Sequence, residues 1–376
     1  MDRRSFCIGA GAAFSGVAVA RTAEGEAARG DIVLGQSAVL SGPVGVVGTA
    51  LRDGAQLVFE GVNAQGGVGG RRLRLVSLDD GLDPARAVAN YKSLATEHRV
   101  AACLLGTGAT TTSAAVPVLR EAGVPLVGAM TVSDSVRDAS AGVAYYVRAS
   151  QQRECEALVT HLTTLGIHRI GVAYFAAPGG EEVLRQLKSI FEQRGAELRG
   201  TAAVAVDGRN AAQECKRLVA QEPQAVVLFL SGAAAAATMD AIRSQGAASS
   251  FYGMSVLSGE VTARLLGGRA HGLAISEVIP YPWDGASPEA VQYRRAAEHA
   301  GVPIGYHSFE GWLVARVLVE ALSRAAPEPT RARLHATLRA MKLRVAGMDL
   351  DFTGGRHTGS HFVELVHVRD NGSFAR

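Results

Sequence analysis

The residues best suited to chemistry follow a short apolar run in the first third of the chain. The run 100–105 predicts a buried parallel strand, and the segment 106–113 after it reads GTGATTTS, with a helix expected over about 114–121. Such a turn presents free backbone N–H groups and hydroxyls to an anion. It also lies at the carboxyl end of a strand, where open α/β sheets bind ligands. The alternative is that Thr110 or Thr111 only caps the helix, and this segment alone leaves both interpretations open.

The first twenty residues (1–20) predict an export signal that is not part of the fold. Arg3 and Arg4 form a charged start, residues 7–20 are small and uncharged, and 18–20 is an Ala-Val-Ala cleavage site. The arginine pair is similar to a twin-arginine signal, with an ordinary secretory signal as the alternative. The apolar run is too short for a stable span, so no membrane insertion is expected after cleavage.

Composition and cysteine spacing exclude several classes of partner. The formal net charge is +3 and no long basic block occurs, so nucleic acid is not expected to bind. After the signal, Cys103, Cys155 and Cys215 remain, without the spacing of a metal site, and they are expected to be small buried hydrophobes. We therefore expect no cofactor and no metal.

Strand-like and helix-like segments alternate along most of the chain. The first set has strands at 32–38, 73–79, 100–105 and 125–127, with helices at 48–64, 84–97 and 114–121. A second set has helices at 154–165, 181–194, 211–221 and 235–245, with strands at 169–174, 202–206 and 225–230. A final part has strands at 272–278, 350–352 and 361–368, with helices at 288–300, 307–324 and 330–341. This alternation predicts an α/β fold of two doubly wound parallel-sheet lobes, joined by a multi-crossing hinge with a cleft between them.

We expect the first lobe to comprise residues 31–147 plus 277–349 and the second to comprise 148–276 plus 350–376. About 350 mature residues suit two domains better than one.

Several motifs, in this order and spacing, resemble those of one family. They are GQSAVLSGP at 35–43, VNAQGGVGGR at 62–71, DDGLDP at 79–84, the turn at 106–113, GVP at 123–125, YYVRAS at 145–150 and FYG at 251–253. Over essentially the whole mature chain, the sequence resembles the periplasmic substrate-binding proteins of branched-chain amino-acid-type ABC importers. This leucine/isoleucine/valine-binding-like family has the type I periplasmic binding protein fold.

The resemblance implies a site for a ligand carboxylate. The carboxylate would meet the hydroxyl and N–H of Thr110, with Ala129 and Thr131 beside it, and Gly108 and Ala109 would line the same turn.

For two further residues the sequence allows either a ligand contact or a purely structural role. Ser41 either contacts the ligand or only forms a turn, and Tyr306 either covers the ligand or packs at the start of a helix.

Departures from the family pattern concern the rest of the ligand. The acid that usually holds the ligand ammonium is replaced by Ser255, and two tyrosines that often close over the ligand align with Gly179 and Ala234. The resemblance therefore implies a ligand that can carry a carboxylate, need not carry an amino group, and has extra room. A shift of the alignment would allow other polar side chains to take the missing role: Tyr174, Asp240, Glu260 or Glu277.

We expect a periplasmic solute-binding protein, not an enzyme, that captures a small molecule as a monomer and delivers it to a membrane-embedded ABC permease. One alternative is a ligand-sensing protein of the same fold that feeds a receptor. Another alternative is an exported oxidoreductase. The segment 42–48, GPVGVVG, argues against it, because it does not match the G-x-G-x-x-G dinucleotide fingerprint.

Overall fold

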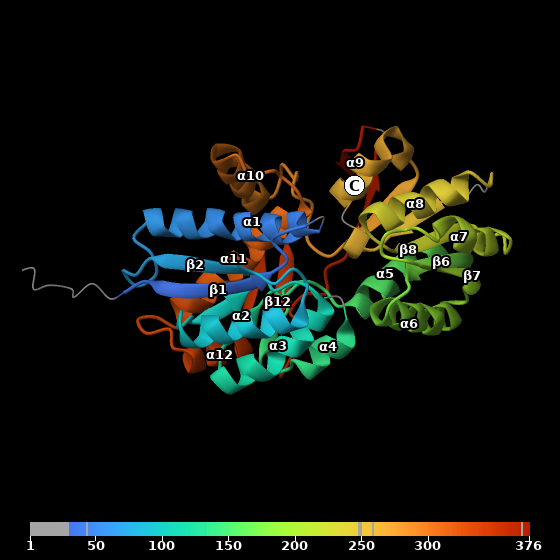
Figure 1. Ribbon diagram of the computed structural model, residues 1–376. Coiled ribbons are helices and arrows are strands. Elements are labelled where there is room, and N and C mark those ends of the chain that lie inside the picture. Colours follow the sequence, from blue (N-terminus) through green and yellow to red (C-terminus); the bar gives the residue numbers. More distant parts are fainter. Residues whose placement is uncertain (1–29, 43, 132, 247–249, 258, 370) are drawn as a thin grey trace, which may run out of the picture.

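The computed structural model describes residues 30–42, 44–131, 133–246, 250–257, 259–369 and 371–376. The expected export signal, 1–20, lies outside the described residues. Figure 1 shows two α/β units side by side, each a sheet with helices on both faces. The expected α/β fold with doubly wound parallel sheets is confirmed.

The first unit is built on five parallel strands in the order β2-β1-β3-β4-β5. The strands are β1 (Ile32–Ala38), β2 (Leu73–Asp79), β3 (Ala102–Leu104), β4 (Leu126–Val127) and β5 (Ala144–Tyr145). The helices are α1 (Gly45–Ala64), α2 (Pro84–Thr96), α3 (Ala109–Ala122), α4 (Asp134–Ala139), α10 (Pro288–Ala300), α11 (Tyr306–Arg324) and α12 (Arg331–Arg339). Helices α1 and α11 pack together on one face of the sheet, and α2 and α3 pack together on the other (Figure 1).

The second unit repeats this strand order and then extends it. Five parallel strands run β7-β6-β8-β9-β10, and β13 and β14 continue the sheet in antiparallel pairing beyond β10. The strands are β6 (Arg169–Phe175), β7 (Glu197–Val204), β8 (Ala225–Phe229), β9 (Ser250–Gly253), β10 (Leu273–Glu277), β13 (Glu364–Val368) and β14 (Phe374–Ala375). The helices are α5 (Gln151–Thr164), α6 (Pro178–Arg194), α7 (Ala211–Val219), α8 (Gly232–Arg243), α9 (Gly259–Leu266) and the short 3₁₀ helices η1 (Ser255–Leu257) and η2 (Gly267–Ala270).

Element bounds agree best with the sequence where the apolar pattern is strong. The strands expected at 32–38 and 73–79 and the helix at 288–300 have the observed bounds. The strand expected at 202–206 is instead Glu197–Val204, because β7 lies at an edge of its sheet and its first residues are not buried. The structure has a two-stranded hairpin of β11 (Lys342–Val345) and β12 (Met348–Asp351). The sequence predicts a strand close to β12, at 350–352, but does not predict β11.

The chain passes between the two sheets three times, over 146–150, 278–287 and 352–363. The first and third passages pair with each other. Tyr146 N donates to His357 O at 2.7 Å, and Gly359 N donates to Tyr146 O at 2.8 Å. Two connecting segments are thus held together where the units meet.

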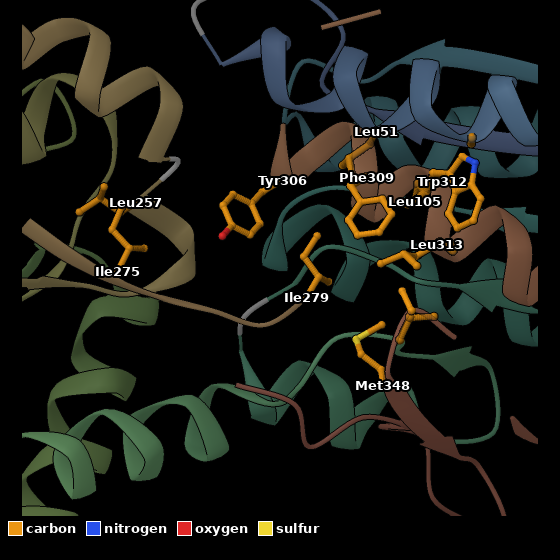
Figure 2. Packing of buried hydrophobic residues seen from close by; sticks show 14 of the residues in the cluster. Leu51, Leu105, Leu257, Ile275, Ile279, Tyr306, Phe309, Trp312, Leu313 and Met348 are labelled. Atoms are coloured by element: carbon orange, nitrogen blue, oxygen red, sulfur yellow. The ribbon is translucent and has the colours of Figure 1, made fainter. Parts of the chain in front are cut away.

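Three apolar clusters fill the interior. One lies under α2 and α3, and another lies under α5 and α6. The third is continuous from the α1 and α11 face of the first sheet to the α8 and α9 face of the second, through Ile279 and Tyr306 (Figure 2). The two units therefore share buried apolar surface.

Close packing of α1 against α11 requires glycine at two positions. A Cβ on Gly54 would overlap the carbonyl oxygen of Ser308, and a Cβ on Gly311 would overlap that of Leu51. The two helix backbones can approach only because neither residue has a side chain.

The substitution Gly54→Ala is expected to lower the free energy of unfolding by about 1–3 kcal/mol, because the added methyl forces the helices apart. Gly61→Ala in the same helix is the matched control, because nothing lies within 4 Å of its Cβ position. It is expected to raise stability by up to about 1 kcal/mol through helix propensity. Urea unfolding followed by circular dichroism measures both, and equal effects would contradict the close approach of the two helices.

Candidate functional site

The turn after β3 contains two residues with positive φ. Leu105 has φ +54° and Gly108 has φ +87°, both in the left-handed region that favours glycine. A Cβ on Gly108 would lie 2.8 Å from Thr111 Oγ1, so glycine is required there. Thr107 Oγ1 accepts a hydrogen bond from Val39 N at 2.8 Å, which ties this turn to the end of β1.

The helix start after this turn leaves backbone donors free. Gly108 is the N-cap of α3 and no side chain caps the helix, so neither Thr110 nor Thr111 serves as the cap. The hydroxyl of Thr112 donates back to Gly108 O at 2.6 Å. Within the described part of the chain, the amides 109–111 have no hydrogen-bond acceptor, and Thr110 is exposed beside them. Free amides and a hydroxyl at a helix start suit an anion.

A second segment of the predicted site lies directly beside this turn. Gly108 N donates to Met130 O at 3.2 Å, and Met130 N donates to Gly106 O at 2.7 Å. Ala129 and Thr131 flank Met130, and both are buried in this structure. The structure thus brings 108–110 and 129–131 together, as the predicted carboxylate site requires, with the Ala129 and Thr131 side chains closed off from solvent.

Ser41 is held in its loop by an acid. Its hydroxyl donates to Asp79 Oδ2 at 2.5 Å, and Leu40 N donates to Asp79 Oδ1 at 2.8 Å. These bonds hold the pKa of Asp79 below its usual value. The Ser41 proton is therefore committed within the loop, and its oxygen remains available only as an acceptor.

The two predicted small residues of the second unit differ in their surroundings. Gly179 lies in the first turn of α6, and nothing lies within 4 Å of its Cβ position. Ala234 in α8 is buried, and its Cα would lie 3.2 Å from a Cβ on Gly208. Open space in α8 lies instead at Gly232, the first residue of the helix. A larger side chain would therefore meet open space at Gly179 and Gly232, whereas Ala234 is enclosed.

Ser255 belongs to a buried polar network. Ser255 N donates to Glu154 Oε1 at 2.5 Å and its hydroxyl donates to Oε2 at 3.0 Å. The hydroxyl of Ser276 donates to the same acid at 2.7 Å. Burial raises the pKa of Glu154, and these hydrogen bonds oppose the rise.

Arg148 links this network to the first unit. Its Nη2 donates to Ser255 Oγ at 3.3 Å, and its Nε lies 3.2 Å from Glu310 Oε1 in α11. The side chains of Arg148 and Glu310 are only 5% and 4% exposed. Sequence reasoning assigned no role to either residue. The available signal was a charged residue inside each of the apolar runs 143–149 and 309–314.

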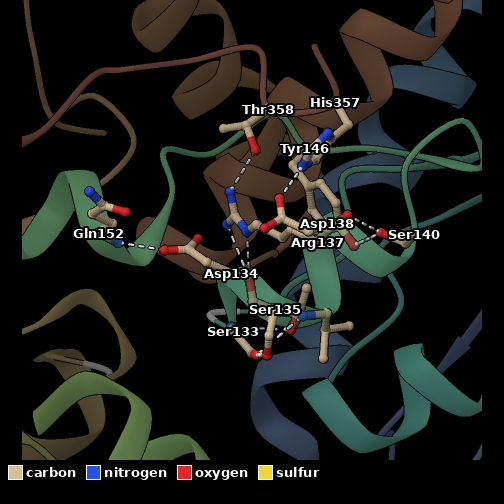
Figure 3. A network of polar contacts seen from close by, with 12 residues as sticks. Ser133, Asp134, Ser135, Arg137, Asp138, Ser140, Tyr146, Gln152, His357 and Thr358 are labelled. Carbon is tan, nitrogen blue, oxygen red and sulfur yellow. Dashed lines mark hydrogen bonds and ion pairs between the residues drawn. The ribbon is translucent and has the colours of Figure 1, made fainter. Parts of the chain in front are cut away.

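Arg137 holds the connecting segments in place (Figure 3). Its guanidinium donates to Thr131 O at 3.0 Å, to Arg148 O at 3.2 Å and to Thr358 Oγ1 at 3.3 Å. It also stacks over the Tyr146 ring, 4.6 Å from the centroid. Burial lowers the pKa of Arg137 to about 10, so it remains charged at neutral pH.

A carboxylate of the second unit also contacts the first unit. Ser133 Oγ donates to Glu182 Oε2 at 2.7 Å, and Ser135 N donates to Glu182 Oε1 at 3.1 Å. Glu182 belongs to α6, near Gly179, whereas the serines lie at the start of α4. This contact joins the units on the side where the predicted ligand residues lie.

Tyr306 begins α11 and is 3% exposed. Its backbone N donates to Glu260 Oε1 of α9 at 2.7 Å. Its ring packs edge-on against Trp283 and Phe374, with centroids 5.8 and 5.7 Å away. Packing between the units therefore accounts for the position of its ring.

Two other kinds of feature are not found within the described ranges. No group of three or more His, Cys, Asp or Glu side chains there could hold a metal ion. No helix there combines the length and apolar character needed to cross a membrane.

Residues 31–373 match the periplasmic binding protein family. The chain belongs to this family. Among curated proteins, none matches the sequence.

Solved structures are similar over nearly the whole chain. The substrate-binding periplasmic protein from Ralstonia solanacearum is 30% identical with a TM-score of 0.83, covering 92% of this chain and 99% of that one. A "possible leucine/isoleucine/valine-binding protein" from Rhodopirellula baltica SH 1 is 25% identical, with a TM-score of 0.82 over 93% and 96% of the two chains. An extracellular ligand-binding receptor from Verminephrobacter eiseniae is 24% identical with a TM-score of 0.86, covering 92% of this chain and 100% of that one, and supports the fold alone.

The substitution Arg148→Gln is expected to lower the free energy of unfolding by about 3–5 kcal/mol, because it leaves the buried Glu310 without its ion pair. Arg344→Gln is the control, because Arg344 and Asp349 form an exposed pair with side chains 71% and 80% exposed. Such pairs contribute little, so no measurable change is expected. Chemical unfolding measures both variants, and a loss of under about 1 kcal/mol for Arg148→Gln would contradict the role assigned to this pair.

Glu364 lies opposite Glu277 in the β10–β13 pair and makes stability depend on pH. Burial raises the pKa of Glu364 from 4.5 to about 7, opposed by Arg376 3.2 Å away. Between these two values the folded protein holds a proton that the unfolded chain has lost, so this group makes stability fall as pH rises from about 4.5 to about 7. Glu364→Gln is therefore expected to gain stability relative to wild type as the pH rises through this window.

Unfolding free energies measured at about pH 5 and about pH 8 test this. Glu298→Gln, an exposed acid on α10, is the control and should follow wild type at both pH values. A difference between Glu364→Gln and wild type that does not change with pH would contradict the raised pKa.

Proposed function

We propose that this chain is an exported solute-binding protein that takes up a small carboxylate-bearing molecule between two lobes and delivers it to an ABC permease. The lobes would be 31–147 plus 277–349 and 148–276 plus 350–376, with the boundary at 349/350 falling inside β12. Its part in transport would be binding, without catalysis, as a monomer in the periplasm. The Arg3-Arg4 signal supports export, by the twin-arginine route or by the ordinary secretory route.

The connections between the units support a ligand site between them. The passage 146–150 leaves the carboxyl end of β5 and enters the start of α5, which lies at the carboxyl edge of the second sheet. The passage 278–287 likewise leaves the carboxyl end of β10 and enters the start of α10. The carboxyl edges of both sheets are therefore turned toward the same boundary, and such edges bind ligands in open α/β sheets.

The observation that carries the carboxylate assignment is the start of α3. Three backbone amides, 109–111, have no acceptor there within the described residues, and the exposed Thr110 adds a hydroxyl. Neutral donors at a helix start hold a carboxylate without a buried countercharge. The similar protein from Rhodopirellula baltica is described as a possible leucine/isoleucine/valine-binding protein, and those three amino acids bear a carboxylate.

Thermal shift on refolded, solute-free protein tests the proposal with a panel of amino acids, aliphatic acids and aromatic acids. A ligand at a hundred times its Kd adds about 2.7 kcal/mol of stability, which such a screen detects. Stabilisation by acids or amino acids supports the proposal. Stabilisation by none of these molecules would contradict the carboxylate assignment.

The substitution Thr110→Ala is expected to weaken binding of the best acid from that screen by about 1–3 kcal/mol, because a hydrogen bond to a charged group is lost. Ser113→Ala is the matched control, since Ser113 is an exposed hydroxyl of the same helix beyond the free amides. Isothermal titration calorimetry measures both variants. Unchanged affinity in Thr110→Ala would remove Thr110 from the site.

A further inference from the structure

A pocket of about 620 Å³ lies between α9, the passage 278–287 and the C-terminal segment that contains β14. Figure 1 shows the C-terminus beside α9. The side chains that matter most come from all three elements: Glu260 and Arg264, Tyr281 and Trp283, and Arg369 and Phe374. A pocket of this size can hold a small molecule. The residues of the predicted carboxylate site do not line it, so it is a separate feature of the molecule.

One wall of this pocket is aromatic, and its rings are fixed in place. The Trp283 ring stacks on Phe374, with centroids 5.6 Å apart and an angle of 14° between the planes. The Tyr281 ring lies 5.3 Å from Trp283, and its hydroxyl donates to Phe374 O at 2.7 Å. Phe374 is buried, whereas Trp283 and Tyr281 are half-buried and line the pocket. A fixed and partly exposed aromatic wall suits a ligand that carries an aromatic ring.

The charged side chains among the described residues of this pocket are Arg264, Arg369 and Glu260. Both arginines are exposed, and neither guanidinium has a hydrogen-bond or ion-pair partner in the part of the chain that the structure describes. Glu260 lies one helical turn before Arg264, but it accepts a hydrogen bond from Tyr306 N at 2.7 Å. Because Asp370 lies outside the described residues, Arg264 is the cation on which the assignment of an anion depends.

We propose that this pocket is a second binding site, which takes a small aromatic carboxylate. The ring of the occupant lies against the aromatic wall of Tyr281, Trp283 and Phe374, and its carboxylate accepts hydrogen bonds from Arg264 and Arg369. A guanidinium binds a carboxylate through two parallel hydrogen bonds, which fix the orientation of the anion. Both arginines are exposed, so little desolvation opposes the contact. This site does not rest on the proposed function, because it shares no residue with the start of α3.

The emission of Trp283 reports on this pocket. The chain has two tryptophans, and the other, Trp312 of α11, is only 2% exposed. The probes are 3-phenylpropanoate and its neutral amide, 3-phenylpropanamide, titrated into refolded, solute-free mature protein. A phenyl group does not absorb at the long-wavelength edge of tryptophan excitation, so any change in emission comes from the protein.

Four variants locate the response. Arg264→Gln removes the charge, and Trp283→Phe removes the reporter but keeps an aromatic ring. Arg295→Gln on α10 is the matched control, because Arg295 is exposed and has no partner within the described ranges. Thr110→Ala separates this pocket from the start of α3. Thermal unfolding without ligand confirms that each variant is folded.

In wild type, 3-phenylpropanoate is expected to change the emission saturably and to bind at least about tenfold more tightly than the amide, because hydrogen bonds between charged groups are the stronger ones. Arg264→Gln is expected to weaken the affinity seen by emission about tenfold or more, for the same reason. Trp283→Phe is expected to abolish the change in emission. Arg295→Gln and Thr110→Ala are expected to leave the affinity seen by emission unchanged.

The failures of this site and of the proposed function are distinguishable. No saturable response in wild type, an unchanged affinity in Arg264→Gln, or equal affinities for the acid and the amide would each overturn the second site. A response that Thr110→Ala weakens and Arg264→Gln does not would belong to the start of α3, which overturns the second site and supports the proposed function. A response that only Arg264→Gln weakens supports the second site, even if calorimetry shows that Thr110→Ala changes no affinity for acids.

Discussion

The buried guanidinium of Arg148 is the interaction on which the joining of the two α/β units depends. Arg148 follows the last strand of the first sheet, and its side chain contacts Glu310 in the first unit and Ser255 in the second. A buried charge is stable only with its partners. Separating Arg148 from Glu310 or from Ser255 would leave that charge uncompensated and would cost free energy. Arg137 adds a bond to the Arg148 carbonyl and holds Thr131, beside the predicted carboxylate site. The geometry of that site is thus coupled to the buried pair.

Positive φ angles and free backbone donors occur together at the start of α3. The turn there has two residues at positive φ and is held by Thr107 and by the segment around Met130, so its amides are fixed before any ligand arrives. Prearranged donors lose little entropy on binding. The second unit contributes the carboxylate of Glu182, which contacts Ser133 and Ser135 of the first unit. In the proposed function, one unit supplies the anion site and the other supplies selectivity.

The sequence was sufficient where the determinants are local. The strands 32–38 and 73–79 depend on apolar runs that lie next to turn residues in the chain. The helix expected at 114–121 instead begins at Ala109, so only 106–108 of the expected turn lie outside the helix. It was insufficient where the determinants are distant. The Arg148–Glu310 pair joins residues from two different parts of the chain, and a single charge in an apolar run does not name its partner. Ala234 illustrates the same limit, because only packing against Gly208 reveals that it is enclosed. The sequence did not predict the hairpin of β11 and β12 as a pair, because its strands are short and partly polar.

Two lobes hinged at the Arg148 network are expected to close on a ligand. Small-angle X-ray scattering of the solute-free mature protein, with and without the tightest ligand from the thermal-shift panel, tests this most directly. A smaller radius of gyration is predicted with ligand, because hinge closure is a rigid-body movement of whole lobes. An unchanged scattering curve at saturating ligand would contradict closure and leave a protein whose units are fixed in their relative position.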